Sequence, residues 1–172
     1  PGMLRRKDWI HEAYRLGTPM GGDLPAGGGD RAPAFIVQAV KDPDGANIDR
    51  IQVVKVWLED GRYREKVFDV ALSGNRRADP RTGRAPPVGD TVDLATATYR
   101  NTIGATQLLA IWRDPEFRRS QPAVYYLRAL EIPTPRWSTY LAALRGLPVP
   151  KEGGPPKLQE RAWSSPIWYT PA

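Results

Sequence analysis

The chain contains one histidine and no cysteine, and these counts limit its chemistry. Without cysteine there is no thiol nucleophile, no disulfide and no thiolate metal site. His11 would need a serine and a carboxylate beside it to form a hydrolytic triad. It lies in a short predicted helix, and no serine of the chain sits in a Gly-x-Ser-x-Gly turn. We therefore predict a surface position for His11, and neither a catalytic nor a metal-binding residue in this chain.

Oxygen ligands for a weak cation site are concentrated in one stretch, which contains Asp42, Asp44, Asn47 and Asp49. Calcium prefers several carboxylate and carbonyl oxygens that lie close together in the sequence. This stretch lacks the spacing and the final bidentate glutamate of an EF-hand loop. The pattern favours the alternative, a turn stabilised by aspartate side chains, with Asp49 paired to an arginine.

Two further carboxylates, Asp69 and Asp93, occupy outward positions of predicted strands. A carboxylate pair can support acid–base catalysis in principle. Cross-strand pairing with arginine or lysine is the simpler explanation for both residues.

Adjacent glycines follow the first predicted helix, in the segment Met20, Gly21, Gly22 and Asp23. The segment is no phosphate loop, because the Lys-Ser/Thr signature and the preceding strand are both missing. Two adjacent glycines do permit a neighbour or a ligand to approach the backbone closely.

Six tryptophans are candidates for binding surfaces. Most are expected in the core or in packing between domains, and a sugar-stacking platform is the alternative. An apolar patch that includes Trp9 or Trp168 would favour contact between domains. A row of exposed tryptophans on one sheet face would favour sugar binding. The six are Trp9, Trp57, Trp112, Trp137, Trp163 and Trp168.

The net charge of +6 does not by itself indicate nucleic-acid binding. The one concentration of arginines lies in a Pro- and Gly-rich loop without interleaved aromatic residues, and we expect it to be solvated: Arg76, Arg77, Arg81 and Arg84. We expect no nucleic-acid partner. No apolar run is long enough for a membrane helix, and no signal peptide is visible. The start at Pro1 suggests a processed or excised fragment that could have lost a targeting signal.

Strands must position most of these residues. Helices are predicted over residues 8–16, with Asp8 as N-cap, and around Trp137 to Leu144, with a single helical turn at residues 114–116. Asp60-Gly61 predicts a tight hairpin. A phase slip near Val53-Val54 indicates a β-bulge or burial on both faces. Strands are predicted over residues 35–40, 48–58, 64–72, 91–99, 107–113, 123–132 and 158–169.

This pattern predicts a mainly β fold, an antiparallel, immunoglobulin-like β-sandwich of about seven strands with two short helical insertions. We divide the chain into an N-terminal helix and Gly-rich linker, residues 1–30, and a sandwich domain, residues 31–172. Residues 133–157 form a helical insertion within that domain.

Several long motifs, in order, resemble the C-terminal region of a bacterial family of unknown function, domain-of-unknown-function family 3604. They are PMGGDL at residues 19–24, KDPDGANIDRIQVVK at 41–55, EIPTPRW at 131–137 and ERAWSSPIWYTP at 160–171. Full-length members look like polymerase-and-histidinol-phosphatase (PHP) metallohydrolases. In those proteins a distorted barrel holds divalent metals through His and Asp/Glu ligands, and a β-sandwich often follows the barrel.

The resemblance implies a divalent metal in a missing upstream domain and no cofactor in this chain, which lacks the ligand-rich part. It implies that residues 125–128 and 162–168 form paired final strands, with the helix around Tyr140 inserted between them. Met20 to Asp23 would lie near the junction with the catalytic domain, and Asn101 would lie near its cleft.

The function implied is that of a non-catalytic accessory domain of a metal-dependent hydrolase, whose partner is the catalytic domain of the same polypeptide. In the isolated chain, the surface that normally packs on the catalytic domain would be exposed, and it would allow copies of the chain to associate. The alternatives are a stand-alone carbohydrate- or surface-binding module and, less favoured, an enzyme with a deep pocket of titratable groups. Members of the family are often exported, so a periplasmic or secreted location is compatible with the resemblance, but the compartment stays open.

Overall fold

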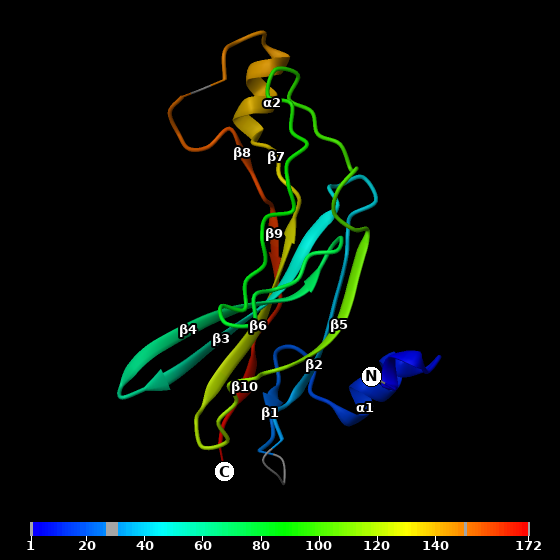
Figure 1. The fold of residues 1–172 in the computed structure, drawn as a ribbon, viewed down its shortest axis with the longest axis vertical. Coiled ribbons are helices and arrows are strands. Elements are labelled where there is room, and N and C mark those ends of the chain that lie inside the picture. Colours follow the sequence, from blue (N-terminus) through cyan, green and yellow to red (C-terminus); the bar gives the residue numbers. More distant parts are fainter. Residues whose placement is uncertain (1, 27–30, 150, 172) are drawn as a thin grey trace.

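The computed structural model describes residues 2–26, 31–149 and 151–171. The fold is mainly β, as predicted, and the molecule is elongated (Figure 1). Helix α2 (Trp137–Leu144) lies at one end, whereas α1 (Trp9–Leu16), preceded by the 3-10 helix η1 (Met3–Arg5), projects beside the other end. None of the helices in the described ranges could span a lipid bilayer.

The described residues form one large, six-stranded sheet. Its order is β1 (Asp23–Leu24), β10 (Ile167–Tyr169), β6 (Ala123–Glu131), β3 (Ile48–Glu59) and β4 (Arg62–Leu72), and β9 (Arg161–Trp163) also pairs with β6. The pairs are antiparallel except for β1 with β10. The pairing of β6 with both β9 and β10 confirms the expected contact between these distant segments.

A two-stranded antiparallel ribbon, β2 (Ala34–Val40) with β5 (Gln107–Arg113), packs on one face of the large sheet. The Phe35 ring lies 4.8 Å from the Tyr125 ring and 5.8 Å from the Trp112 ring, centroid to centroid. The buried residues of this core come from both layers: Phe35, Val37, Ile51, Val53, Ala71, Ala123, Tyr125 and Tyr169. Burial of these apolar side chains is the main favourable term that joins the layers.

Strand β3 is central and buried on both faces over its first eight residues, which explains the phase slip in its sequence. The bulge expected at Val53-Val54 is not at that position. The register shifts lie earlier, between Ile51 and Gln52 against β4 and between Ile48 and Arg50 against β6.

The Asp60-Gly61 hairpin is confirmed. Both residues have positive φ, 51° and 71°, as a two-residue turn of type I′ requires.

Three of the predicted elements differ from those in the structure. Residues 91–99 form a turn instead of a strand, because the Asp93 carboxylate accepts the Ala95 N–H at 2.9 Å and Ala97 takes a φ of 49°. The Asp114 carboxylate binds the Glu116 N–H at 2.8 Å and closes a turn, not a helical turn. Residues 158–169 are divided among β8 (Lys157–Leu158), β9 and β10.

Both predicted helices are confirmed, but their surroundings differ from expectation. Asp8 makes no side-chain cap and pairs with Arg6 at 3.3 Å. Helix α2 stands on the small pair β7 (Thr134–Pro135) and β8, and it buries only Thr139 and Ala142. Its apolar stripe therefore faces solvent: Trp137, Tyr140, Leu141 and Leu144.

Candidate interdomain surface

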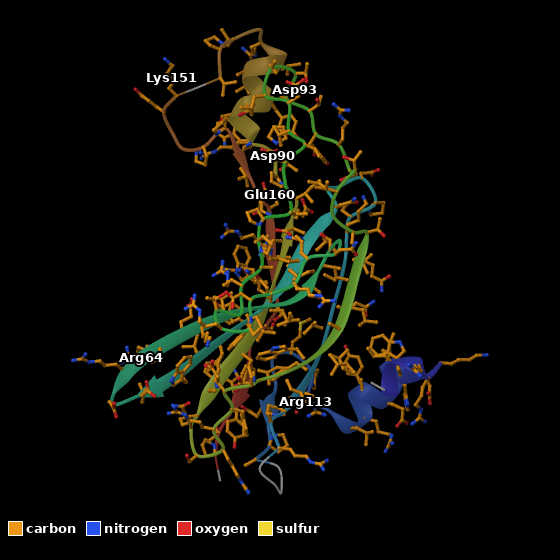
Figure 2. All side chains as sticks on the ribbon, in the orientation of Figure 1. Arg64, Asp90, Asp93, Arg113, Lys151 and Glu160 are labelled. Atoms are coloured by element: carbon orange, nitrogen blue, oxygen red, sulfur yellow. The ribbon has the colours of Figure 1, made fainter. Side chains whose placement is uncertain are left out.

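A groove with a volume of about 790 Å³ separates α1 from the β2–β5 ribbon and the neighbouring edge of the large sheet. Figure 1 shows α1 standing away from the ribbon. Among the described residues that line the groove, Arg113 is the only charged one, and it ends β5 on the side of α1 (Figure 2). The remaining lining is mostly apolar and includes Trp9, Ile10, Tyr14, Met20, Leu24 and Ile167.

Helix α1 is amphipathic, because its eight residues place apolar and polar side chains on opposite sides. The polar side carries His11, Glu12 and Arg15. Arg15 donates to the Glu12 carboxylate at 2.8 Å and holds the pKa of Glu12 below its usual range. The exposed position of His11 agrees with the expectation for that residue.

The apolar side of α1 remains open to solvent, since no residue of the helix is buried. Ile10 is 55 %, Tyr14 69 % and Leu16 61 % exposed. A helix of this length is marginal in water without packing against another surface. The helix therefore presents an apolar face that lacks a matching partner within the described chain.

The Gly-Gly segment fixes α1 to the large sheet. The Gly21 N–H donates to the Pro166 carbonyl at 2.8 Å, and the Trp168 N–H donates to the Gly22 carbonyl at 3.1 Å. A Cβ at Gly22 would approach Thr18 Cγ2 to 2.8 Å, so a larger residue here would require the Thr18 side chain to shift. Met20, 65 % exposed, borders the groove.

Asn101 does not contact Met20 to Asp23 and instead hydrogen-bonds to the turn that precedes β3. Its Oδ1 accepts the Asn47 N–H at 2.8 Å, and its Nδ2 donates to the Gly45 carbonyl at 3.2 Å. The structure thus does not bring together the residues expected near a cleft, and a cleft role for Asn101 stays a prediction.

The stretch predicted as a weak cation site forms a turn, and the ammonium group of Lys41 contacts its backbone carbonyls. The Asp42 carboxylate accepts the Asp44 N–H at 2.9 Å. Lys41 Nζ donates to the carbonyls of residues 42, 43 and 45 at 2.6 to 3.0 Å. Within the described ranges, no group of three or more acidic or histidine side chains could hold a metal ion. Cation binding at this stretch stays a prediction.

A buried charge network occupies the opposite end of β3 from the hairpin. Arg50 donates to Asp49 at 2.9 Å and to Asp69 at 2.7 Å, and Arg76 donates to Asp49 at 2.6 Å. Asp69 lies on the sheet face opposite the ribbon, as its predicted outward position implies, but the loop that follows β4 covers it and the side chain is buried. Its pairing with an arginine agrees with the simpler explanation. Arg76 is also not solvated as expected, since only 14 % of its side chain is exposed.

A second buried ion pair, not predicted from the sequence, joins β3 to the turn after β5. Lys55 Nζ lies 2.5 Å from Asp114 Oδ2, which also accepts the Tyr125 hydroxyl at 2.8 Å. Burial, with Asp114 nearby, raises the pKa of Tyr125 above its usual range. A lysine inside the apolar run of β3 was the available signal, because a buried ammonium requires a partner. Every buried polar side-chain atom in the described residues has a hydrogen-bond partner, so these pairs serve the fold.

Comparison with known proteins gives one match. A family model described as "Protein of unknown function (DUF3604)" matches residues 1–171. Searches of curated proteins and of solved structures return no match. The matched range includes α1, the Gly-Gly segment and both β layers.

Proposed function

This chain belongs to the DUF3604 family of proteins of unknown function, and from that premise we propose that it is a non-catalytic accessory β domain of a metal-dependent hydrolase. Its role is to pack against the catalytic domain of the same polypeptide. That domain, related to the PHP metallohydrolases, lies upstream and holds the divalent metal. The observation that carries the proposal is the open apolar face of α1 beside the groove.

Exposed apolar surface of this kind is typical of contacts between proteins or domains. Burying one large apolar side chain contributes about 1.5 to 3 kcal/mol. Ile10 and Tyr14, both more than half exposed, together with Met20 would therefore add appreciable free energy to such a contact. The hydrogen bonds from the Gly-Gly segment to β10 would transmit the contact to the large sheet.

The lining of the groove supports a packing role and not a chemical one. Its side chains are mainly apolar, and the charged group among the described lining residues is a guanidinium, which offers hydrogen-bond donors and no acceptor. Acid–base chemistry needs groups that exchange protons near neutral pH. We assign the hydrolytic step, with its metal, to the upstream domain.

We also propose that the ribbon and the large sheet form an open, immunoglobulin-like sandwich, with residues 1–30 as the segment that joins the two domains. The shared core of Phe35, Val37, Val53 and Tyr125 supports the two-layer description. The helical insertion between β6 and β9 would leave this core unchanged, because α2 makes its contacts elsewhere.

Paired variants of the full-length polypeptide test the accessory role. We expect the double variant Ile10→Glu, Tyr14→Glu to separate one calorimetric unfolding transition into two, because charges in the groove would break the contact between the domains. Tyr63→Glu is the matched control: Tyr63 is 86 % exposed and lies on the β3–β4 hairpin, whose neighbouring Arg64 points away from the α1 side (Figure 2). Equal unfolding profiles for the double variant and the control would reject the proposed contact.

A further inference from the structure

Trp163 and Trp168 lie on the same face of the large sheet, although five positions separate them. Trp163 pairs with Arg128 and Trp168 with Val124, and paired residues share a face. Val124 and Arg128 share a face of β6, because strand side chains alternate with a period of two. An uninterrupted strand would have placed the two tryptophans on opposite faces.

The segment between β9 and β10 produces this arrangement. From the Trp163 pair to the Ile167 pair, the chain advances four residues while β6 advances three, from Arg128 to Tyr125. The extra residue acts as a bulge, which reverses the direction of the following side chains. The Leu127 N–H, bound by the Ser164 hydroxyl at 2.9 Å, is satisfied within this interruption.

Both indole rings are open to solvent on the face opposite the ribbon. Trp163 is 60 % and Trp168 49 % exposed, whereas Tyr125, on the other face of β6, lies in the core. Their partners on β6 are four residues apart, which corresponds to roughly 13 Å along the strand. Tyr126 occupies the same face of β6 between the two partners. Together these three residues form what we term the aromatic platform.

Charged groups of opposite sign border the aromatic platform. Asp23 is exposed and pairs with Trp168 in the parallel β1–β10 register, so its carboxylate lies beside that ring. Arg128 lies beside Trp163 and donates to the Gln52 side chain at 2.8 Å. A neutral ligand rich in hydroxyl groups suits one acceptor and one donor, whereas a polyanion would be repelled by Asp23.

We propose that the aromatic platform binds an extended, neutral oligosaccharide of β-linked hexopyranoses. The C–H faces of separate sugar rings pack on Trp163 and Trp168, and hydroxyls at their edges hydrogen-bond to Asp23 and Arg128. Aromatic surface with a few placed polar groups is the usual composition of a site for a polar organic ligand. This binding site adjoins the α1 groove, which Tyr126 also lines, but it does not depend on the accessory role.

Calorimetric titration of the purified 172-residue chain with two neutral hexasaccharides, cellohexaose and hexa-N-acetylchitohexaose, tests the proposal. We expect saturable binding of at least one hexasaccharide, weakened about tenfold by Trp163→Ala and by Trp168→Ala, through loss of one stacking contact each. Trp137→Ala is the matched control, since it removes a 68 % exposed tryptophan from α2 and leaves the aromatic platform intact. It should bind like the parent chain.

The absence of binding to both hexasaccharides at millimolar concentration would overturn the proposal, as would an equal loss in Trp137→Ala. If the tryptophan variants instead abolish association between copies of the chain, without any saccharide binding, the face is a protein interface and the proposal is wrong. Asp23→Ala keeps both rings and provides a second test should a tryptophan variant not fold. Unchanged hexasaccharide affinity in Asp23→Ala would reject the assigned carboxylate.

Discussion

Arg50 donates hydrogen bonds to two buried carboxylates, those of Asp49 and Asp69. The Asp69 side chain is fully buried and also binds the Gln52 amide at 2.6 Å and the Ala85 N–H at 2.5 Å. Such a network connects β3, β4 and the loop that follows β4. Removing one charge leaves the other buried without compensation.

The first prediction follows from this network. Asp69→Asn should lower the free energy of unfolding by about 3 kcal/mol, because it leaves the Arg50 guanidinium buried with only one carboxylate. Urea unfolding at neutral pH measures the loss. Asp44→Asn, at an exposed turn position, should stay within about 0.5 kcal/mol of the parent. If Asp69→Asn lost no more stability than Asp44→Asn, the network would contribute little to the free energy of unfolding.

The pH dependence of stability gives the second prediction. Burial, with Glu160 and Asp42 nearby, raises the pKa of Glu131 above its ordinary value of 4.5. The folded state therefore binds this proton more tightly than the unfolded state, and the contribution to stability is lost as pH rises from 4.5 through the folded pKa. The free energy of unfolding of Glu131→Gln, measured relative to that of the parent, should therefore increase as the pH is raised from 4 to 7.

Asp93 provides a comparison of opposite sign, because backbone N–H groups, that of Ala95 first, lower its pKa. Its contribution is present above the unfolded pKa and is lost as pH falls through the folded pKa. Asp93→Asn should thus lose stability relative to the parent at pH 7. Urea titrations at both pH values measure the two differences, and parallel profiles for both variants would contradict the assigned shifts.

At the scale of elements, Gly104 is the position where backbone conformation and close packing coincide. Its φ is 81°, and an added Cβ would lie 2.6 Å from Asn47 Cβ and 2.7 Å from Ile132 Cγ2. The short bridge between Ile48 and Ala105 depends on this close approach.

The third prediction is that Gly104→Ala destabilises the chain by about 2 kcal/mol more than Gly146→Ala, through overpacking. Gly146 shares the positive φ, at 62°, but an added Cβ there meets open space. Both substitutions place an alanine at a positive φ, so most of the difference between them comes from the clash at Gly104. Thermal unfolding followed by circular dichroism measures it. Equal losses would show that Asn47 and Ile132 can move aside.

Local signals were sufficient to predict most elements. The Asp60-Gly61 turn and the β-branched runs of β2, β3 and β6 specified strands and a hairpin through residues adjacent in sequence. The strand expected over residues 91–99 failed because one aspartate side chain competes with the ladder for backbone N–H groups. The break between β9 and β10 had a local signal in Pro166, which argues against a continuous strand. The pairing of both segments with β6 is long-range and has no local signal.

The candidate site was only partly predictable for the same reason. The Gly-Gly segment indicated close backbone approach, and the structure places it against β10. The amphipathic pattern of α1 could be read from the sequence, but its distance from the ribbon could not. The apolar pattern of α2 predicted a helix correctly. It did not predict that Thr139 and Ala142 would be the buried residues of this helix and that its apolar residues would be exposed.

At the scale of the whole molecule, open apolar surface should drive association of the isolated chain. The fourth prediction is that sedimentation velocity at high protein concentration shows dimers or larger species, since the face of α1 would pack on another copy. Ile10→Glu with Tyr14→Glu should shift the chain toward monomer, whereas Tyr63→Glu should not. Monomer alone at every concentration would contradict this expectation.

The proposed contact between α1 and an upstream catalytic domain is tested most directly by amide hydrogen exchange, compared between the isolated chain and the full-length polypeptide. At a concentration at which the isolated chain is monomeric, residues 9–16 should exchange rapidly in it, because none of them is buried, and much more slowly in the full-length polypeptide. The hairpin tip at residues 59–63 should exchange equally in both. Equal exchange of residues 9–16 in the two proteins would contradict the account.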